Sequence, residues 1–366
     1  MPRSEAWVAR VKALAERIAA SAARLARPVR LMEVCGTHAH AVGRYGLRQL
    51  LPPNVDLISG PGCPVCVTTG GQIEMALELA RRGITVTTFG DLMRVPAPGG
   101  SLAEARAAGA DVRVVYSPQQ ALDIALAEKS REVVFVAVGF ETTAPAVAAV
   151  VSQALAAGLD NLSFLCLHKT IPPALEALVQ DRELGVDGFL CPGHVSVIIG
   201  SEAYRPLAQQ YRVPCVVAGF EPADIMLGLA MLVDQLAQGR CEVENAYTRA
   251  VRPEGNALAR AMMGEVFEPV DVAWRGLGRV VDGGLALRGA YRALCARERY
   301  GVQEQDTGEP AGCRCGDVLR GILRPSECPL FGRACTPAHP VGPCMVSSEG
   351  ACAAVHKYES AFLVAP

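Results

Sequence analysis

The chain has 366 residues, which is too long for one ordinary hydrophobic core, so two or three domains are expected. Its composition is 51% hydrophobic and 20% charged, which indicates a folded aliphatic protein and excludes a disordered one. The net charge is −2, so no basic surplus indicates a nucleic-acid partner, and no charge run indicates a membrane surface.

The first 29 residues predict an amphipathic helix that packs on the body of the protein. Trp7, Val11, Leu14 and Ile18 recur at helical spacing. The stretch lacks the apolar core of a signal peptide, and no apolar run in the chain is long enough to span a bilayer. We therefore expect a cytoplasmic protein whose fourteen cysteines serve metal binding or catalysis rather than a disulfide scaffold.

Between residue 30 and about residue 239, short aliphatic runs alternate with helical stretches. Such runs are typical of parallel strands buried on both faces, and their alternation with helices indicates doubly wound α/β units. Eight strands are predicted, at 31–34, 55–59, 85–89, 112–116, 133–138, 162–167, 188–190 and 213–218. Helices are predicted at 71–82, 119–129, 145–157 and 222–237, and a further helix at 285–299.

We expect these units to form two doubly wound parallel-sheet domains, followed by a small cysteine-rich domain. A Gly-Phe-Glu tripeptide follows two of the strands, at 139–141 and 219–221, and this weak repeat favours two sheets. The polar, turn-rich stretch 301–312 is typical of a linker. The expected division is 1–29 for the N-terminal helix, 30–130 and 131–300 for the two α/β domains, and 301–366 for the cysteine-rich domain.

Unusual residues follow several predicted strands directly. Ligands of parallel α/β sheets collect at the carboxyl ends of strands, so we expect these loops to line one cleft. The loop after the first strand carries Cys35, Thr37 and His38. A nearby imidazole or a helix N-terminus would lower the pKa of the Cys35 thiol and favour the metal-binding thiolate. The plainer alternative is a buried cysteine at a strand end, beside a loop histidine.

Cys63 and Cys66 follow the second strand with the Cys-x-x-Cys spacing of disulfide oxidoreductases. The same spacing forms half of a zinc site, but the chain has no second Cys-x-x-Cys pair to complete one. A redox pair and a zinc half-site both stay open, with zinc the weaker. Neither a P-loop nor a complete dinucleotide fingerprint is present, so no organic cofactor is indicated.

Glu141 and His194, at the ends of two later strands, are further candidate catalytic residues. Glu141 precedes a predicted helix, so its simpler role is to favour the helix dipole. His194 follows Pro-Gly at a turn, where one histidine is more often structural. The cysteines in apolar contexts are interpreted as small core residues, namely Cys166, Cys191, Cys215, Cys241 and Cys295.

Six cysteines gather near the C-terminus: Cys313, Cys315, Cys328, Cys335, Cys344 and Cys352. Such an array needs a metal cluster, disulfides or both. One iron–sulfur cubane takes four cysteines, and the two left over could form a redox pair. Zinc sites usually draw on two close Cys-x-x-Cys pairs, whereas the last four cysteines here are single residues spaced by six to eight others. The spacing therefore favours iron–sulfur over zinc.

Taken together, these motifs closely resemble the HypD family of hydrogenase maturation proteins. The matching segments cover nearly the whole chain in order: CGTHAHA at 35–41, SGPGCPVCVT at 59–68, FGDLMRVP at 89–96, GFETTAP at 139–145, HKTIPPAL at 168–175, CPGHVSVIIG at 191–200, AGFEPADI at 218–225, and CRCGDVLRG through GPCMVSSEGACA at 313–353. No cysteine position departs from the family pattern. The combination is very specific, although each motif alone is weak.

The resemblance implies a role in assembling the Fe(CN)2CO unit of [NiFe] hydrogenases. It implies two partners, a small chaperone, HypC, that shares the iron, and HypE, which delivers the cyanide groups. It also implies two similar α/β domains and a third domain with a [4Fe–4S] cluster, similar to the cluster site of ferredoxin:thioredoxin reductase. By that pattern, Cys315 would pair with Cys344 in a redox disulfide. The cluster ligands would be Cys313, Cys328, Cys335 and Cys352.

The mechanism that we expect from this resemblance begins at Cys35, which would hold the iron together with a HypC thiolate. Thr37 and His38 would orient the iron or an incoming diatomic ligand. Cys63 and Cys66 would cycle between dithiol and disulfide, with electrons arriving from the cluster. The main alternative is a stand-alone [4Fe–4S]-dependent thiol–disulfide reductase, and a scaffold with a structural metal is a third.

Overall fold

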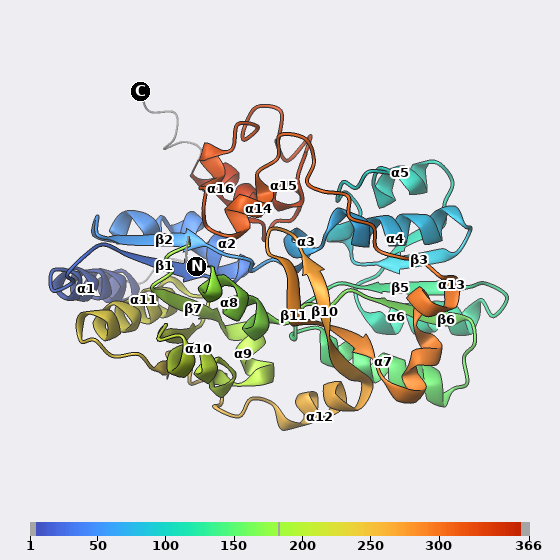
Figure 1. Ribbon diagram of the computed structural model, residues 1–366, viewed down its shortest axis with the longest axis horizontal. Helices are drawn as coiled ribbons and strands as arrows, with labels where there is room; N and C mark the ends of the chain where they lie inside the picture. Colours follow the sequence, from blue (N-terminus) through green and yellow to red (C-terminus); the bar gives the residue numbers. More distant parts are fainter. Residues whose placement is uncertain (1–4, 182–183, 360–366) are drawn as a thin grey trace.

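The computed structural model describes residues 5–181 and 184–359, and two parallel sheets form its frame (Figure 1). The first sheet has the order β2-β1-β7-β8-β9, and each neighbouring pair is parallel. Its strands are β1 (Val29–Glu33), β2 (Val55–Ser59), β7 (Gly188–Pro192), β8 (Cys215–Ala218) and β9 (Val243–Asn245). Parallel pairing brings the carboxyl ends of these strands to one edge of the sheet.

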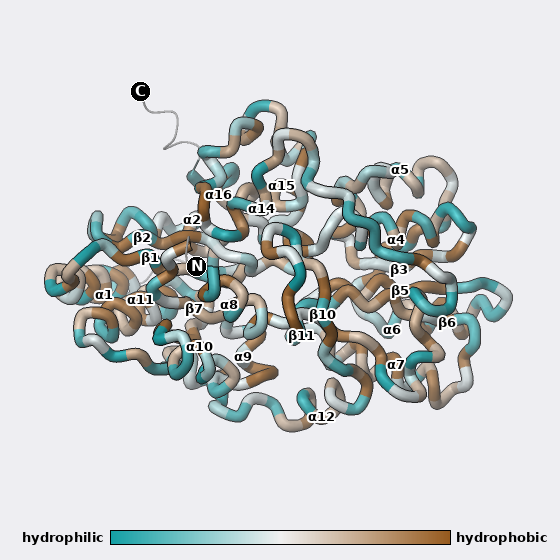
Figure 2. Tube along the Cα trace, viewed as in Figure 1, coloured by the Kyte–Doolittle hydropathy of each residue, from teal (hydrophilic) through white to brown (hydrophobic). Residues whose placement is uncertain are grey.

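The second sheet has the order β4-β3-β5-β6 and is also parallel throughout. Its strands are β3 (Thr85–Thr88), β4 (Val112–Val114), β5 (Val133–Ala137) and β6 (Leu162–Cys166). All five residues of β5 are buried, in keeping with the brown, hydrophobic stretches in the interior of the trace in Figure 2. The predicted fold class is confirmed, and all eight predicted strands are present.

The sheets do not divide the chain at the boundary expected near residue 130. That boundary falls between β4 and β5, which lie in one sheet, and β7 to β9 return to the sheet begun by β1 and β2. The first α/β unit is therefore built from two separate stretches of sequence. Strand order depends on long-range packing, which local periodicity does not encode.

Helices cover both faces of the sheets (Figure 1). The N-terminal helix packs as predicted, since Val11 and Ile18 share a core cluster with Leu229 and Val233. The helices are α1 (Glu5–Ala22), α2 (Gly36–Tyr45), α3 (Pro64–Val67), α4 (Gly70–Arg81), α5 (Leu102–Ala107), α6 (Pro118–Ala127), α7 (Ala144–Ala156), α8 (Ile171–Gln180), α9 (Gly193–Ile199), α10 (Arg205–Gln210), α11 (Pro222–Ala237), α12 (Ala257–Val266) and α13 (Ala296–Tyr300). In the part of the chain that the structure describes, no helix combines the length and apolarity that crossing a membrane requires.

An antiparallel hairpin, formed by β10 (Phe267–Trp274) and β11 (Gly278–Leu287), lies in the middle of the molecule (Figure 1). Sequence analysis missed it. The helix predicted at 285–299 is wrong, because β11 runs to Leu287 and only α13 is α-helical in that stretch. The short turn between the strands reaches toward the cysteine-rich region and is central to the final part of the Results.

The cysteine-rich region, residues 301–359 as described, consists of turns and short helices. The helices are α14 (Cys315–Leu319), α15 (Pro343–Val346) and α16 (Ala351–Tyr358). Residues 360–366 of the expected domain, and residues 1–4 of the expected N-terminal helix, lie outside the described residues. The region packs against α2 and α3, next to the edge of the first sheet where the cysteine motifs lie.

Candidate metal and thiol site

A cleft of about 370 Å³ opens where the loops after five strands meet. Its lining includes Cys35 after β1, Gly62 after β2, Asp91 after β3, Thr142 after β5 and His194 after β7. The strands come from both sheets, so the cleft lies between the two α/β units. The prediction that these strand-end loops gather around one cleft is confirmed.

The loops around Cys35 are pressed together by backbone contacts. The N–H of Gly36 donates to the carbonyl of Gly62 over 2.8 Å. A Cβ atom on Gly62 would lie only 2.2 Å from the backbone nitrogen of Cys35, so only glycine fits there. Cys35 is the residue that precedes α2, and it is 7% exposed.

Burial raises the pKa of the Cys35 thiol to about 12. The backbone N–H groups of His38 and Thr37 oppose this rise, while the nearby carboxylate of Glu33 adds to it. Of the two interpretations that the sequence left open, the buried cysteine at a strand end therefore describes the free protein. Glu33 also accepts the backbone N–H of Cys35 over 3.0 Å, which fixes the chain at this point.

His38 lies behind the cleft rather than in it. Its Nε2 donates to the carbonyl of Gly219 over 2.9 Å, and burial lowers the pKa of the ring to about 4, so the ring is neutral. His194 does line the cleft and stacks on Phe220 with 3.8 Å between ring centres. His38 also contacts Phe220, at 5.2 Å, so one aromatic ring holds both histidines.

Thr37 connects the cleft to the cysteine-rich region. Its hydroxyl donates to Oε1 of Glu349 over 3.4 Å, and Glu349 also lines the cleft. A Cβ atom on Gly36 would lie 2.4 Å from that of Glu349, so the two segments are in close contact. Sequence analysis missed Glu349. Its position just before the last cysteine of the array offered no sign that it reaches a loop more than 300 residues away.

Glu141 does not line the cleft, although its neighbours do. It is 3% exposed, and its Oε1 accepts the backbone N–H of Ile171, at the start of α8, over 2.9 Å. Burial raises the pKa of this carboxyl group to about 7. Glu141 therefore sits at the N-terminus of α8 rather than of the helix that follows it in sequence, and the geometry gives it a structural role.

Cys63 and Cys66 form a disulfide across α3, with their Cα atoms 5.2 Å apart. Both are buried, and neither lines the cleft, although the flanking Gly62 and Pro64 do. The Sγ of Cys66 lies 3.9 Å from the carbonyl of Pro343 in α15. The thiol pair thus lies between the cleft and the cysteine-rich region.

All six C-terminal cysteines line a single small cavity, together with apolar residues that include Leu330, Phe331 and Met345. Cys315 forms hydrogen bonds with Cys313 and Cys344, and these lower the pKa of its thiol well below the usual range. The proposed pairing of Cys315 with Cys344 is not a disulfide in this structure: the two are adjacent free thiols.

The donor set of this cavity fits an iron–sulfur cluster. Converging sulfur atoms with an apolar surround are what such a cluster requires. A larger residue at position 342 would crowd these sulfur atoms, since a Cβ atom on Gly342 would lie 2.6 Å from the Sγ of Cys313. Among residues 5–181 and 184–359, no three His, Cys, Asp or Glu side chains are already arranged to hold a single metal ion.

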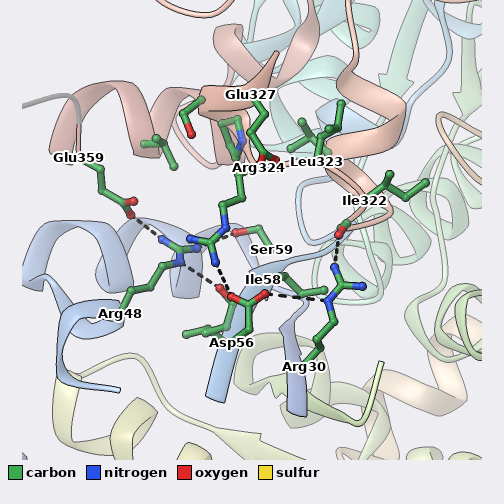
Figure 3. Close-up of a pocket in the computed structure, with 16 residues that line it drawn as sticks. Arg30, Arg48, Asp56, Ile58, Ser59, Ile322, Leu323, Arg324, Glu327 and Glu359 are labelled. Atoms are coloured by element: carbon green, nitrogen blue, oxygen red, sulfur yellow. Dashed lines mark hydrogen bonds and ion pairs between the residues drawn. The ribbon is translucent and has the colours of Figure 1, made fainter. Parts of the chain in front are cut away.

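A second, charged cavity of about 230 Å³ lies at the seam between β2 and the cysteine-rich region (Figure 3). Three arginines in it are already satisfied. Arg324 pairs with Asp56 over 2.6 Å, Arg48 pairs with Glu359 over 2.5 Å, and Arg30 donates to the carbonyl of Gly321 over 2.5 Å. This cavity contains none of the predicted site residues, and its ion pairs bridge the region and the sheet.

Comparison with known proteins decides the family. The family model described as "HypD: Hydrogenase formation hypA family" matches residues 9–359. The chain belongs to the HypD family. It is 49% identical to the hydrogenase maturation factor HypD of Azotobacter vinelandii over 358 residues, which cover 96% of this chain and 94% of that protein. It is 47% identical to the HypD of Cupriavidus necator, covering 94% of each chain, and 47% identical to that of Escherichia coli, covering 91% of this chain and 90% of the relative.

Proposed function

We propose that the protein is a hydrogenase maturation factor that assembles the Fe(CN)2CO unit of [NiFe] hydrogenases together with HypC and HypE. The observation that carries the proposal is the meeting of loops from five strands around Cys35, with a disulfide and a six-cysteine cavity beside them. The relatives named above supply the link to hydrogenase maturation.

Iron is the cargo in this proposal, and Cys35 is its ligand on this chain. Thiolate is a suitable ligand for soft, low-spin iron. Because burial keeps the free Cys35 thiol protonated, iron must displace that proton when it binds. A thiolate from HypC would complete the attachment, and HypE would supply the cyanide. The imidazole ring of His194 and the hydroxyl group of Thr37, which both line the cleft, would then orient the diatomic ligands.

A [4Fe–4S] cluster held by Cys313, Cys328, Cys335 and Cys352 would supply a one-electron redox centre. Cys315 and Cys344 remain as a dithiol beside these four residues. Cys315 lies at the start of α14 and Cys344 lies in α15, between Cys313, which precedes α14, and Cys352, which lies in α16. The dithiol is thus in contact with two of the proposed cluster ligands, Cys313 and Cys352.

The proposed redox step is a thiol–disulfide exchange within the chain. The Cys63–Cys66 bond breaks, a bond between Cys315 and Cys344 forms, and the two protons of the second pair pass to the first. Two electrons move with them, so the step needs no outside reductant. The exchange would start from a disulfide in the first pair and a dithiol in the second, and the bonded Cys63 and Cys66 beside free Cys315 and Cys344 support that direction.

The role of Cys35 is tested with Cys35→Ala, co-purified anaerobically with HypC and HypE. We expect the complex to lose the infrared bands of iron-bound CN and CO. Cys241→Ala is the matched control, because Cys241 is a free, half-buried cysteine that does not line the cleft. An iron-loaded Cys35→Ala complex with unchanged bands would refute the proposal.

The second candidate function is a stand-alone cluster-dependent thiol–disulfide reductase. The contact of Cys66 with α15 favours it, because it brings a disulfide to the cysteine-rich region. This function would not explain the position of Cys35 in the cleft, because a disulfide reductase needs no third thiol there. Two results together would establish the reductase. The protein purified without HypC and HypE would reduce a protein disulfide at a catalytic rate, and the protein mixed with HypC and HypE would acquire no infrared bands of CN or CO.

A further inference from the structure

The turn between β10 and β11 touches segments that carry members of both cysteine pairs. On one side it contacts the chain just after Cys66. The backbone N–H of Arg275 donates to the carbonyl of Val67 over 2.8 Å, and Nη2 of Arg275 donates to the carbonyl of Thr68 over 3.0 Å. The side chain of Arg275 is only 2% exposed, so its charge is committed to these contacts.

On its other side the turn contacts the start of α14, next to Cys315. Gly276 has a φ of +81°, and a Cβ atom there would lie 2.7 Å from the carbonyl oxygen of Gly316. The backbones of Gly276 and Gly316 therefore touch directly. Nη1 of Arg275 also pairs with Glu309 over 3.2 Å, which ties the segment leading to the cysteine array to the same turn.

The turn is rigidly anchored to the sheets. Trp274 is 1% exposed, donates to the carbonyl of Gly283 over 2.8 Å and stacks on Phe140, a residue that lines the Cys35 cleft. The carbonyl of Ala273 accepts from Nζ of the buried Lys169 over 2.8 Å. Two adjacent residues of a fixed turn thus hold Val67 and Thr68 on one side and Gly316 on the other.

We propose that Arg275 and Gly276 are positioning residues for the thiol exchange, because they set the spacing between α3, which carries Cys66, and α14, which begins at Cys315. The inference rests on the proposed function, since it names the element that makes the exchange between the two pairs possible. Exchange requires the sulfur atoms to approach closely and in line, and a misplacement of about 1 Å costs an oriented reaction about 100-fold in rate.

The test compares Gly276→Ala with Gly278→Ala in the holoprotein. Both glycines have a positive φ, +81° and +71°, so alanine strains the backbone at each. Only Gly276 faces a neighbour, because a Cβ atom on Gly278 would meet nothing within 4 Å. The difference between the two variants therefore reports the displacement of the turn from Gly316 and not the strain of the turn itself.

The measured quantity is the rate at which the disulfide passes between the two pairs after the fully reduced protein receives one equivalent of diamide per chain, followed by acid quenching, alkylation and peptide mass spectrometry. The rate of reduction of Cys63–Cys66 by external dithiothreitol is measured in parallel. We expect Gly276→Ala to slow the internal exchange about 100-fold. The external rate should stay at the wild-type value, as should both rates in Gly278→Ala.

A third variant, Arg275→Lys, keeps the charge but loses the fork that spans Thr68 and Glu309, and we expect an intermediate loss of internal exchange. Internal exchange at the wild-type rate in Gly276→Ala would overturn the inference, and so would an equal slowing of internal and external reactions. If the wild-type protein shows no internal exchange, the redox step of the proposed function fails as well. The two failures are thus distinguishable.

Discussion

The Cys35 cleft and the six-cysteine cavity differ in what holds them in place. The cleft is formed by loops at the ends of buried strands, and backbone contacts such as Gly36 to Gly62 fix its geometry. The cavity is enclosed by turns and helices of four, five and eight residues. A segment with so little secondary structure has a small core of its own.

Under the proposed function, this difference separates a preformed site from a site that depends on its cofactor. The cleft would have its shape before iron binds, which suits a place where a cargo is bound and released. The cavity would gain its stability from the proposed cluster, as small metal-binding domains do. Four experiments test or sharpen this contrast, and they follow from the largest expected effect to the smallest.

Replacing a proposed cluster ligand is expected to have the largest effect. Cys328→Ser should remove the cluster and expose residues 313–359 to protease, while the two sheets stay folded. Cleavage in that segment should accelerate more than about 100-fold, the factor that corresponds to about 3 kcal/mol of lost local stability. Limited proteolysis with mass spectrometry measures it, with Cys241→Ser as the control. Equal resistance of variant and wild type would contradict the contrast.

Gly62→Ala tests whether the cleft is held by its backbone contacts. Because the added Cβ atom would meet the backbone of Cys35, we expect a loss of about 1–3 kcal/mol in the free energy of unfolding. Gly264→Ala is the control, since its Cβ atom meets nothing and alanine favours a helix. Denaturant unfolding measures both. A neutral Gly62→Ala would mean that the loops around Cys35 adapt freely.

Lys169→Met tests the buried support beneath the hairpin. Burial lowers the pKa of Lys169 to about 7, and the unfolded value is about 10.4. Between these values the unfolded chain binds more protons, so the free energy of unfolding should rise with pH in the wild type, by at most about 1.4 kcal/mol per pH unit. Lys169→Met should lose this rise between pH 7 and 10. Unfolding curves across that range measure it, and an unchanged slope in the variant would show that the amine is not buried in this way.

Arg324→Ala should have the smallest effect. The ion pair of Arg324 with Asp56 joins the cysteine-rich region to the sheet, but the arginine side chain is 59% exposed. Such pairs contribute less than about 1 kcal/mol. Thermal unfolding should therefore barely change, as for the exposed control Arg205→Ala. A marked release of the cysteine-rich region would instead assign its attachment to the charged seam of Figure 3.

Local patterns were sufficient to predict the strands and the meeting of the loops that follow them. Continuous aliphatic runs such as Val133–Ala137 are typical of strands that are buried on both faces. The loops that follow parallel strands lie at the same edge of the sheet, so they are expected to meet there. The same reasoning predicted that the Cys35 loop and the Cys63 loop would meet. The family resemblance supplied the chemistry, which spacing alone left open between iron and zinc.

The rest depended on partners distant in sequence. The hairpin was missed because its second strand runs into residues 285–299, whose Leu, Ala and Arg content is typical of a helix. The sequence alone gives no sign that Arg275 has a positioning role, because the carbonyl groups that it contacts belong to Val67 and Thr68, some 200 residues earlier. The choice between an activated and a plain buried Cys35 needed the same knowledge, since the partner of the His38 ring, the carbonyl of Gly219, lies some 180 residues later.

The interleaved order of the first sheet also governs when the site can form during synthesis. Strand β1 lies between β2 and β7, so one of its edges has no partner until residues 188–192 have left the ribosome. The cleft lining is completed later still, by residues 347–349. A growing chain folds broadly in the order in which it emerges. Cys35 therefore acquires its full surroundings only after residues 347–349 have emerged, and a product truncated before them presents an incomplete cleft.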